Sequence, residues 1–382
     1  MQLFGKSITA KELRRRVGLV DQVAGIRLAT LESGHARGSR VALVQTGSGL
    51  EFTVLVDRGL DIGAATYNGA PLAWRGSVGD VAPQYFEAEH LRWLRSFQGG
   101  LLATCGLSNV GAPQSGSELS GLGLHGRIGS IPAQDLCITQ QWDKEHYVLR
   151  ISGLLREACV FGEKFALRRT ITAWLGESRI SVQDDLTNEA FHEAPFQLLY
   201  HVNIGWPVVG EGARILAPSR TVAPRDAVAK AGIGQWDQLT APQHGFQEQV
   251  YFHDMKPGKD GRVTAAIVNG DFSKPGCLGV ALSYSADTLP RFAEWKMMGE
   301  QEYVVGLEPA NCGVQGRAVD EAHGLLHRLK PSETVHYRLD FSVIKDAADY
   351  QAVKKLTGAG RPKVAGSYLD FVKPPKGSKL IR

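Results

Sequence analysis

Residues 165–186 read FALRRTITAWLGESRISVQDDL, and the fold class can be argued outward from this stretch. Within 179–186, Ile180 and Val182 alternate with polar neighbours, which is the pattern of a strand with one buried face. The segment before it, 165–174, is rich in aromatic and β-branched residues, and only Leu-Gly-Glu-Ser separates the two. We therefore predict an antiparallel β-hairpin.

A second hairpin is predicted nearer the N-terminus. Residues 50–57, LEFTVLVD, place Phe52 and Val54 on one face, and Thr-Gly-Ser-Gly joins this segment to 41–44. Further strands are predicted at 198–204, 263–268, 278–284, 303–307 and 334–344. Gly, Pro, Asn and Asp fill the spaces between these segments, which is typical of a large antiparallel β-sandwich. The predicted fold is therefore mainly β, with a few peripheral helices.

Two helices are predicted near the ends of the chain. Thr9 and Glu12 form a capping box for a helix that stops at Gly18, and residues 346–356 form a second helix. No internal repeat or low-complexity linker divides the sequence. The expected organisation is an N-terminal helical segment (1–24), a β-sandwich domain (25–345), and a C-terminal helix and extended tail packing on the same domain (346–382).

The composition narrows the class of function. With 43% hydrophobic residues, 21% charged residues and a formal net charge of +4, the chain is typical of globular proteins and has no strong nucleic-acid-binding signature. No apolar run reaches the roughly 18 residues of a membrane helix, and the N-terminal sequence has no apolar signal-peptide core. We therefore expect a cytoplasmic protein that binds neither nucleic acid nor a membrane.

Several common signatures are missing from the sequence. The five cysteines are odd in number and never form a Cys-x-x-Cys pair, which argues against a disulfide framework and a zinc knuckle. There is no Gly-x-x-x-x-Gly-Lys-Ser/Thr loop, no strand-to-helix Gly-x-Gly-x-x-Gly and no Gly-x-Ser-x-Gly elbow. An ATPase, a dinucleotide-dependent dehydrogenase and an esterase are therefore disfavoured.

Polar side chains inside apolar or glycine-rich β segments are the candidates for chemistry, because burying such groups is costly unless they are paired or used. In residues 121–127, Gly-Leu-Gly-Leu-His-Gly-Arg, glycines flank His125 and Arg127 and would let a ligand approach closely. A turn with a hydrogen-bonded His and a solvated Arg fits the same sequence equally well.

Two more candidates lie on predicted strands. His201 and Asn203 are two residues apart and so point to the same face of their strand, although a hydrogen-bonded core His is an equal alternative. Glu308 follows the apolar strand 303–307 and precedes a proline. If it is partly buried its pKa is raised, as a general base working near neutrality requires; the alternative is an exposed Glu at a strand end.

Two weaker candidates carry charged groups. Arg58 follows Asp57 at the start of a turn, and Trp295 lies between Glu294 and Lys296. Salt bridging at a sheet edge is the simpler explanation of each group alone. Sugars are usually bound by an aromatic face with a few polar groups, and both could come from the set Trp206, Trp295, Arg127, Asn203 and Lys296.

Taken in order, these motifs resemble those of the aldose 1-epimerase (galactose mutarotase) superfamily, and especially a bacterial branch of it. Residues 124–127, Leu-His-Gly-Arg, are similar to the family's Leu-His-Gly-Gly stretch. Residues 200–203, Tyr-His-Val-Asn, are similar to its Asn-His-Thr-x-Phe-Asn strand, and residues 307–309 to its C-terminal Leu-Glu-Pro. The resemblance covers roughly residues 25–345.

The resemblance implies the large antiparallel sandwich of galactose mutarotase-like proteins, with a sugar in an open cleft and with no cofactor or metal. It implies that His201 protonates the ring oxygen, that Glu308 removes the proton of the anomeric hydroxyl, and that His125 steadies the ring-oxygen side. The implied activity is interconversion of the α and β anomers of a free or modified aldose, and the chain could form a homodimer. In this scheme His201 is protonated while Glu308 is ionised, and an adjacent carboxylate favours that state.

The sequence also departs from the family. Arg127 replaces the second Gly of His-Gly-Gly, and Tyr200 replaces the Asn before the catalytic His. Asp254 lies at about the right distance for the family's sugar-binding Asp, in the undistinctive context Tyr-Phe-His-Asp. Arg58, Arg127 and Lys296 could together read a carboxylate, sulfonate or phosphate, so an acidic or phosphorylated sugar stays open.

Other functions also stay open. One is a carbohydrate-binding or sensing module without turnover. Another is a metal-dependent isomerase of the cupin type with His125, His201 and Glu308 as ligands, although no His-x-His pair is present. A two-carboxylate glycosidase is less favoured, because only one well-placed acid can be named.

Overall fold

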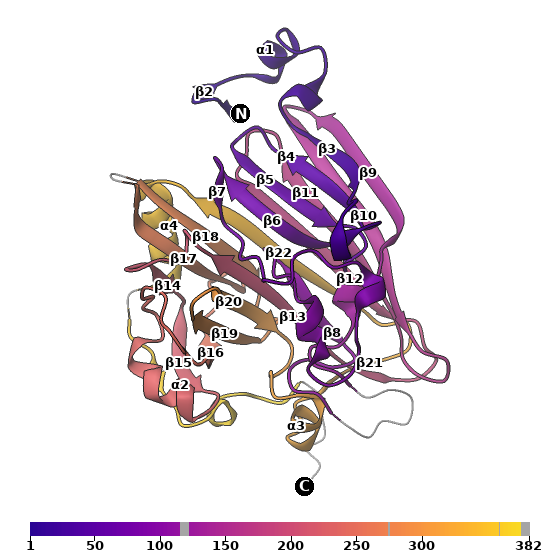
Figure 1. Cartoon of the computed structure of the whole chain (residues 1–382), viewed down its shortest axis with the longest axis vertical. Helices are drawn as coiled ribbons and strands as arrows, with labels where there is room; N and C mark the ends of the chain where they lie inside the picture. Colours follow the sequence, from indigo (N-terminus) through magenta and orange to yellow (C-terminus); the bar gives the residue numbers. More distant parts are fainter. Residues whose placement is uncertain (115–121, 274–275, 359, 376–382) are drawn as a thin grey trace.

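The computed structural model describes residues 1–114, 122–273, 276–358 and 360–375. In this part of the chain, β-sheets form two packed layers with short helices at the rim (Figure 1). Gly121 of the candidate motif and the end of the expected tail, 376–382, lie outside the described residues.

One layer is a long eight-stranded sheet, termed here the first sheet. Its strands, in spatial order, are β14 (Arg214–Leu216), β17 (Arg262–Ser273), β18 (Gly276–Ser285), β22 (Thr334–Ile344), β12 (Arg179–Asn188), β11 (Lys164–Trp174), β10 (His146–Ala158) and β9 (Gln134–Asp143). All the pairings are antiparallel.

The other layer contains two sheets. The second sheet runs β21 (His327–Leu329), β13 (Ala194–Gly205), β20 (Tyr303–Ala310), β19 (Arg291–Met298), β16 (Gln249–Met255), β15 (Ser219–Pro224) and β23 (Lys363–Val364), with β8 (Ala103–Leu107) also paired to β13. The third sheet runs β3 (Gly25–Thr30), β4 (Arg40–Gln45), β5 (Leu50–Leu55), β6 (Asp61–Tyr67) and β7 (Ala70–Pro71). Isolated bridges from Ile62 to Leu102 and from Ala73 to Ile204 connect the third sheet to the second.

The remaining elements are short. A small N-terminal ribbon pairs β1 (Gln2–Leu3) with β2 (Lys6–Ser7). The α-helices are α1 (Ala10–Arg14), α2 (Ala227–Gly232), α3 (Arg317–Ala322) and α4 (Ala347–Thr357). The 3₁₀-helices are η1 (Val20–Gln22), η2 (Gly34–Ala36), η3 (Pro83–Tyr85), η4 (Arg92–Ser96), η5 (Ile128–Ser130), η6 (Ile233–Gln235) and η7 (Tyr368–Asp370). Among the described residues, none of these helices has the length and apolar content that crossing a membrane requires.

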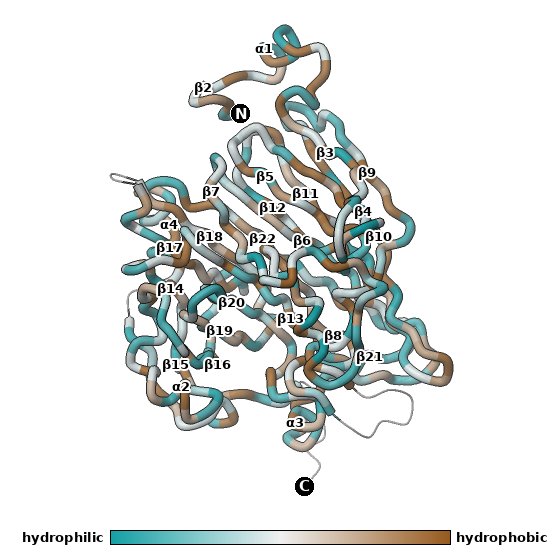
Figure 2. The backbone as a smooth tube through the Cα atoms, viewed as in Figure 1, coloured by the Kyte–Doolittle hydropathy of each residue, from teal (hydrophilic) through white to brown (hydrophobic). Residues whose placement is uncertain are grey.

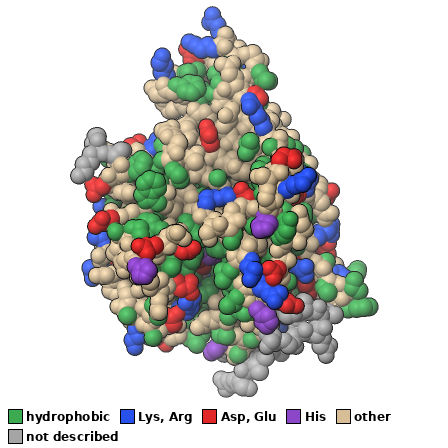
Figure 3. Space-filling model, viewed as in Figure 1, with side chains coloured by type: hydrophobic (Ala, Val, Ile, Leu, Met, Phe, Trp, Pro, Cys, Tyr) green, Lys and Arg blue, Asp and Glu red, His purple; other side chains and the backbone are tan. Residues whose placement is uncertain are grey.

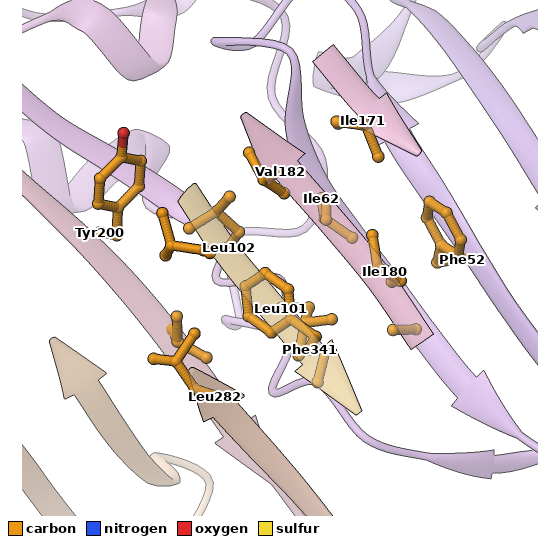
Figure 4. Packing of buried hydrophobic residues seen from close by; sticks show 14 of the residues in the cluster. Phe52, Ile62, Leu101, Leu102, Ile171, Ile180, Val182, Tyr200, Leu282 and Phe341 are labelled. Atoms are coloured by element: carbon orange, nitrogen blue, oxygen red, sulfur yellow. The ribbon is translucent and has the colours of Figure 1, made fainter. Parts of the chain in front are cut away.

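The core fills the space between the two layers. Phe52 and Ile62 of the third sheet pack in one cluster with Ile180 and Phe341 of the first sheet, and Tyr200 of the second sheet joins them (Figure 4). Hydrophobic and hydrophilic residues alternate along many of the strands (Figure 2), as a strand with one buried face requires. The large antiparallel β-sandwich with peripheral helices is therefore confirmed.

A buried ion network crosses this core. Arg169 of β11 is completely buried and donates to Asp184 of β12, at 2.8 Å from Nε to Oδ1 and 2.6 Å from Nη2 to Oδ2, and to Asp61 of β6. Asp61 also accepts hydrogen bonds from the backbone and hydroxyl of Thr104 in β8, and Asp184 accepts one from the Tyr200 hydroxyl. The network centred on Arg169 thus joins strands of all three sheets, the second sheet through the carboxylates of Asp61 and Asp184.

The predicted hairpins correspond to β4–β5 and β11–β12. Thr9 and Glu12 do form the capping box of α1, and α4 ends before Gly358 as predicted. The extent of the first helix was predicted wrongly, because α1 ends at Arg14, four residues before Gly18. Just after this end, the Arg16 guanidinium donates to the Glu12 carbonyl.

Candidate functional site

The candidate residues lie on the outer face of the second sheet. On β13, Tyr200 and Val202 point into the core, whereas His201 and Asn203 alternate to the opposite face. The antiparallel register pairs Asn203 with Gly306 of β20, which brings Glu308 opposite His201. Figure 3 shows that the surface is hollowed over this part of the sheet.

His201 and Glu308 meet directly. His201 Nε2 lies 3.1 Å from Glu308 Oε1, and the two side chains are only 6% and 3% exposed. The contact lacks the alignment of a hydrogen bond, so Oε1 has no hydrogen-bond partner among the described residues, and neither has His201 Nδ1. Two buried polar groups side by side with unused hydrogen-bonding capacity are typical of a site built for a ligand. Glu308 lies within β20, which continues to Ala310, so the alternative of an exposed strand end is excluded.

Gly306 makes room for this pair. A Cβ at this position would lie 2.5 Å from Glu308 Oε1, 3.2 Å from His201 Cε1 and 3.1 Å from Trp295 Cβ. The absence of a side chain therefore lets the carboxylate and the imidazole approach each other.

Aromatic rings enclose His201 on several sides. Its ring centroid lies 5.3 Å from that of Phe97, 5.4 Å from that of Trp295 and 5.8 Å from that of His125. Trp93 stacks on Phe97 at 4.3 Å. Such walls offer apolar faces to a ligand and reduce the polarity around His201 and Glu308.

Polar contacts hold Trp295 in place. Its indole Nε1 donates to Glu248 Oε2 at 2.8 Å, and Arg225 donates to the other carboxylate oxygen at 2.8 Å. Both groups also act on Glu308 electrostatically, Glu248 raising its pKa and Arg225 lowering it.

His125 comes from a tight loop beside the pair. Its φ of +56° and the φ of +67° at Gly126 bend the chain, and a Cβ on Gly126 would lie 2.3 Å from the Gly106 carbonyl. The backbone N–H of Gly111 donates to His125 Nδ1 at 3.4 Å. The neutral ring accordingly carries its proton on Nε2 and can donate one hydrogen bond.

Burial sets the protonation of the site. Burial raises the pKa of Glu308 to about 8, while burial and the neighbouring His125 lower the pKa of His201 to about 3. Burial also lowers the pKa of His125 to about 4. The raised pKa expected for Glu308 is therefore present. The charged pair expected from the sequence is not favoured: near neutral pH the pair holds one proton, on Glu308, because burial opposes both charges.

Other residues predicted for the site lie away from His201 and Glu308 or form hydrogen bonds to the backbone. The Arg58 guanidinium donates to the carbonyls of Val81, Ser96 and Gly129, so it braces the loop that carries Phe97, and burial lowers its pKa to about 10.

Lys296 is separated from Trp295 by the alternation of β19. Its Nζ lies on the opposite face of the sheet and donates to the carbonyls of Gln235 and Gln238 at 2.8 and 2.7 Å. Asn203 is on the same face as His201, but its amide nitrogen donates to the Gly100 and His201 carbonyls, so it fixes the backbone. Arg127 is exposed, and within the described residues no contact joins its side chain to the pair. The structure thus groups His125, His201, Trp295 and Glu308, and not Arg58 or Lys296.

Sequence reasoning missed several members of the enclosure. These are Phe97, Trp93, Trp74, Glu248 and Arg225. The one available signal was that Phe97 immediately precedes the glycine-rich segment Gln-Gly-Gly at residues 98–100. As for metals, no three His, Cys, Asp or Glu side chains of the described residues are arranged to share an ion, so His125, His201 and Glu308 do not form the ligand set of the cupin-type alternative.

Comparison with known proteins places the chain in a family. Residues 36–343 match the family described as "Domain of unknown function (DUF4432)". The chain belongs to this family. No curated protein matches the chain.

Solved structures extend the comparison. The chain is similar to a protein from Klebsiella pneumoniae described as a "putative aldose 1-epimerase", with 25% identity, a TM-score of 0.85, and coverage of 93% of this chain and 94% of that chain. It shares its fold with a galactose mutarotase-like protein from Clostridium acetobutylicum (12% identity, TM-score 0.54, coverage 84% and 99%). It also shares it with galactose 1-epimerase from Lactobacillus acidophilus NCFM (13% identity, TM-score 0.51, coverage 85% and 99%). This DUF4432 chain is therefore a member of the galactose mutarotase-like superfamily, which confirms the resemblance seen in the sequence.

Proposed function

We propose that this protein is an aldose 1-epimerase-like isomerase that interconverts the α and β anomers of an aldose by acid–base ring opening. The observation that supports this most is the buried contact of His201 with Glu308 inside an aromatic enclosure. Mutarotation needs one acid and one base near a hemiacetal and no cofactor, and each group contributes about 10² to 10⁴-fold.

The proposed reaction balances with the one proton that the pair holds. A sugar hydroxyl that donates to Glu308 stabilises the ionised carboxylate, so the proton of the pair moves to His201. Glu308 then removes the proton of the anomeric hydroxyl, the C1–O5 bond breaks, and O5 takes the proton from His201. Rotation about the C1–C2 bond and reclosure give the other anomer, while His125 donates a hydrogen bond from Nε2 on the ring-oxygen side and keeps its proton.

The cation placement favours an uncharged aldose. Of the three cations suggested for reading an anionic group, Arg58 and Lys296 already donate to backbone carbonyls, and Arg127 is exposed. The aromatic walls of Phe97 and Trp295 instead suit the C–H faces of a neutral sugar ring.

The direct test is exchange NMR on chelator-treated protein with neutral, acidic and phosphorylated aldoses. We expect faster exchange between anomers for at least one neutral aldose. Binding of sugars without faster exchange would instead favour the non-catalytic sensing module.

The activity should depend on pH through Glu308. Its folded pKa of about 8 means that the single proton of the pair is lost as the pH rises through that value. We expect kcat/KM to be level between pH 6 and about 7.5 and to fall about tenfold per pH unit well above 8. The same shift makes folding less favourable as the pH rises from the ordinary Glu value of 4.5 to about 8, because the folded state binds the extra proton. Circular dichroism at each pH separates the two effects, and a level profile to pH 10 in folded protein would contradict the proposal.

Gly306→Ala tests the geometry without removing either reacting group. The new methyl group must displace the flexible end of Glu308, which is 2.5 Å from its position. Since a misplacement of about 1 Å can cost about 10²-fold, we expect kcat/KM to fall by roughly that factor with the fold intact. Gly270→Ala in β17 is the matched control, because no atom lies within 4 Å of its Cβ position. Equal activity of the two variants would show that the placement of Glu308 is unimportant.

A further inference from the structure

A second cavity lies beneath the C-terminal segment. It has a volume of about 320 Å³ and is lined on one side by Phe252 of β16 and by Arg291 and Ala293 of β19, and on the other by Tyr368 and Phe371. Neither His201 nor Glu308 lines it, although Ala293 pairs with Glu308 across the two strands. The cavity therefore adjoins the catalytic pair without including it.

The C-terminal wall of this cavity is anchored. Val364 of β23 pairs with Val222 of β15, and Ser367 and Asp370 form a capping box around η7. The Tyr368 ring packs on Phe252 with its centroid at 4.5 Å. Strand pairing, capping and ring packing thus fix this wall of the cavity in the fold.

Three buried polar atoms of the lining residues have no hydrogen-bond partner among the described residues: Arg291 Nε, the Tyr368 hydroxyl and His253 Nε2. His253 Nε2 lies 3.3 Å from Glu294 Oε2, which leaves Arg291 Nε and the Tyr368 hydroxyl as the two donors without a charged neighbour of their own. Arg291 and Tyr368 are only 8% and 4% exposed. The other nitrogens of Arg291 are fixed, Nη1 by Asp320 at 3.5 Å and Nη2 by the Leu325 carbonyl at 2.9 Å. Leaving donors unpaired inside a protein is costly, and such groups are usually satisfied by a ligand.

Gly313 lies beside the Tyr368 hydroxyl and beside the carboxylate that pairs with Arg291. A Cβ on Gly313, which also lines the cavity, would be 3.4 Å from the Tyr368 hydroxyl and 3.1 Å from Asp320 Oδ1. Asp320 in turn contacts Arg291. The absence of a side chain at Gly313 leaves room beside the Tyr368 hydroxyl.

The charged groups and the apolar lining of the cavity indicate the class of ligand that fits it. The Arg220 guanidinium is paired with Asp254 at 3.2 Å, and Asp320 partly neutralises Arg291. Lys373 lies exposed among the lining residues and adds a positive charge. The rest of the lining is largely apolar, with Phe252, Phe371, Val372, Met255, Ala286 and Pro290. Donors with a nearby cation favour a carboxylate, and the aromatic walls favour a flat apolar body.

We propose that this cavity is a second ligand site, which binds a small aromatic or otherwise apolar carboxylate. The carboxylate accepts from Arg291 Nε and the Tyr368 hydroxyl, and the apolar body lies between Phe252 and Phe371. The site is independent of the proposed isomerase activity.

The test is a fluorine NMR titration of the full chain with para-fluorobenzoate, compared with the neutral para-fluorobenzamide. We expect saturable binding of the carboxylate, at least tenfold tighter than binding of the amide. Tyr368→Phe should weaken carboxylate binding about tenfold without lowering the melting temperature, because it removes an unpaired hydroxyl and keeps the ring. Tyr85→Phe, at an exposed tyrosine, is the matched control and should bind normally.

Glu308→Gln keeps this experiment separate from the proposed function. The variant should bind para-fluorobenzoate as the unchanged protein does, whatever its activity. No saturable binding at millimolar probe, equal binding of the amide, or normal binding by folded Tyr368→Phe would each overturn the proposal.

Discussion

Glu308→Gln is expected to lower kcat/KM for anomer exchange by at least about a hundredfold, because a neutral amide cannot take the anomeric proton. The substitution preserves the size of the side chain. Since Glu308 is buried and its carboxyl is neutral near pH 7, the amide should not introduce a new buried charge, and the fold should persist. Exchange NMR gives the rate, and circular dichroism checks the fold.

His201→Asn should give a loss of similar size, and the double variant should lose little more than either single one, because the two groups exchange one proton. Glu300→Gln is the matched control: this residue is exposed at the turn before β20 and pairs with His244. A folded Glu308→Gln or His201→Asn protein with normal exchange rates would remove the proposed mechanism.

The largest expected effect on stability comes from Arg169→Met. This change leaves the carboxylates of Asp61 and Asp184 buried without their shared cation, and breaking a buried pair in this way costs about 3–5 kcal/mol. Thr104 and Tyr200 still donate to these carboxylates, so part of the network survives. The free energy of unfolding in urea measures the loss.

The neighbouring Arg168 supplies the control. It lies on the same strand with its side chain exposed, so Arg168→Met should change the free energy of unfolding by no more than about 0.5 kcal/mol. Equal stability of the two variants would mean that the buried guanidinium does not hold the layers together.

Much of the sheet pattern could be predicted, because polar and apolar residues alternate along a strand that has one face exposed to solvent. The hairpin of β11 and β12 is the clearest case. Strand β19 was missed for a physical reason: both of its faces are buried, and one of them carries Glu294 and Lys296, so hydrophobic alternation is absent. The same alternation explains why Trp295 and Lys296, adjacent in sequence, do not share a pocket.

Some residues of the candidate site could be picked out from the sequence, but their arrangement could not. His201 and Glu308 stood out as polar residues in apolar strands, but their contact depends on the register of β13 with β20, which no local sequence pattern specifies. Arg58 was wrongly predicted to bind a ligand, because its guanidinium donates to backbone carbonyls of loops that are distant in sequence. Glu248 and Arg225 matter through Trp295, a contact that exists only in the folded sheet.

The position of His201 and Glu308 on β13 and β20 also has a consequence for the order of folding. These strands come from distant parts of the chain, and β8, which flanks β13 on its other side, comes from a third. Closing long loops is entropically costly, so local hairpins such as β11–β12 and β17–β18 form ahead of such pairings. A nascent chain can therefore hold these hairpins of its first sheet before His201 and Glu308 meet, so the proposed acid–base pair is assembled after them.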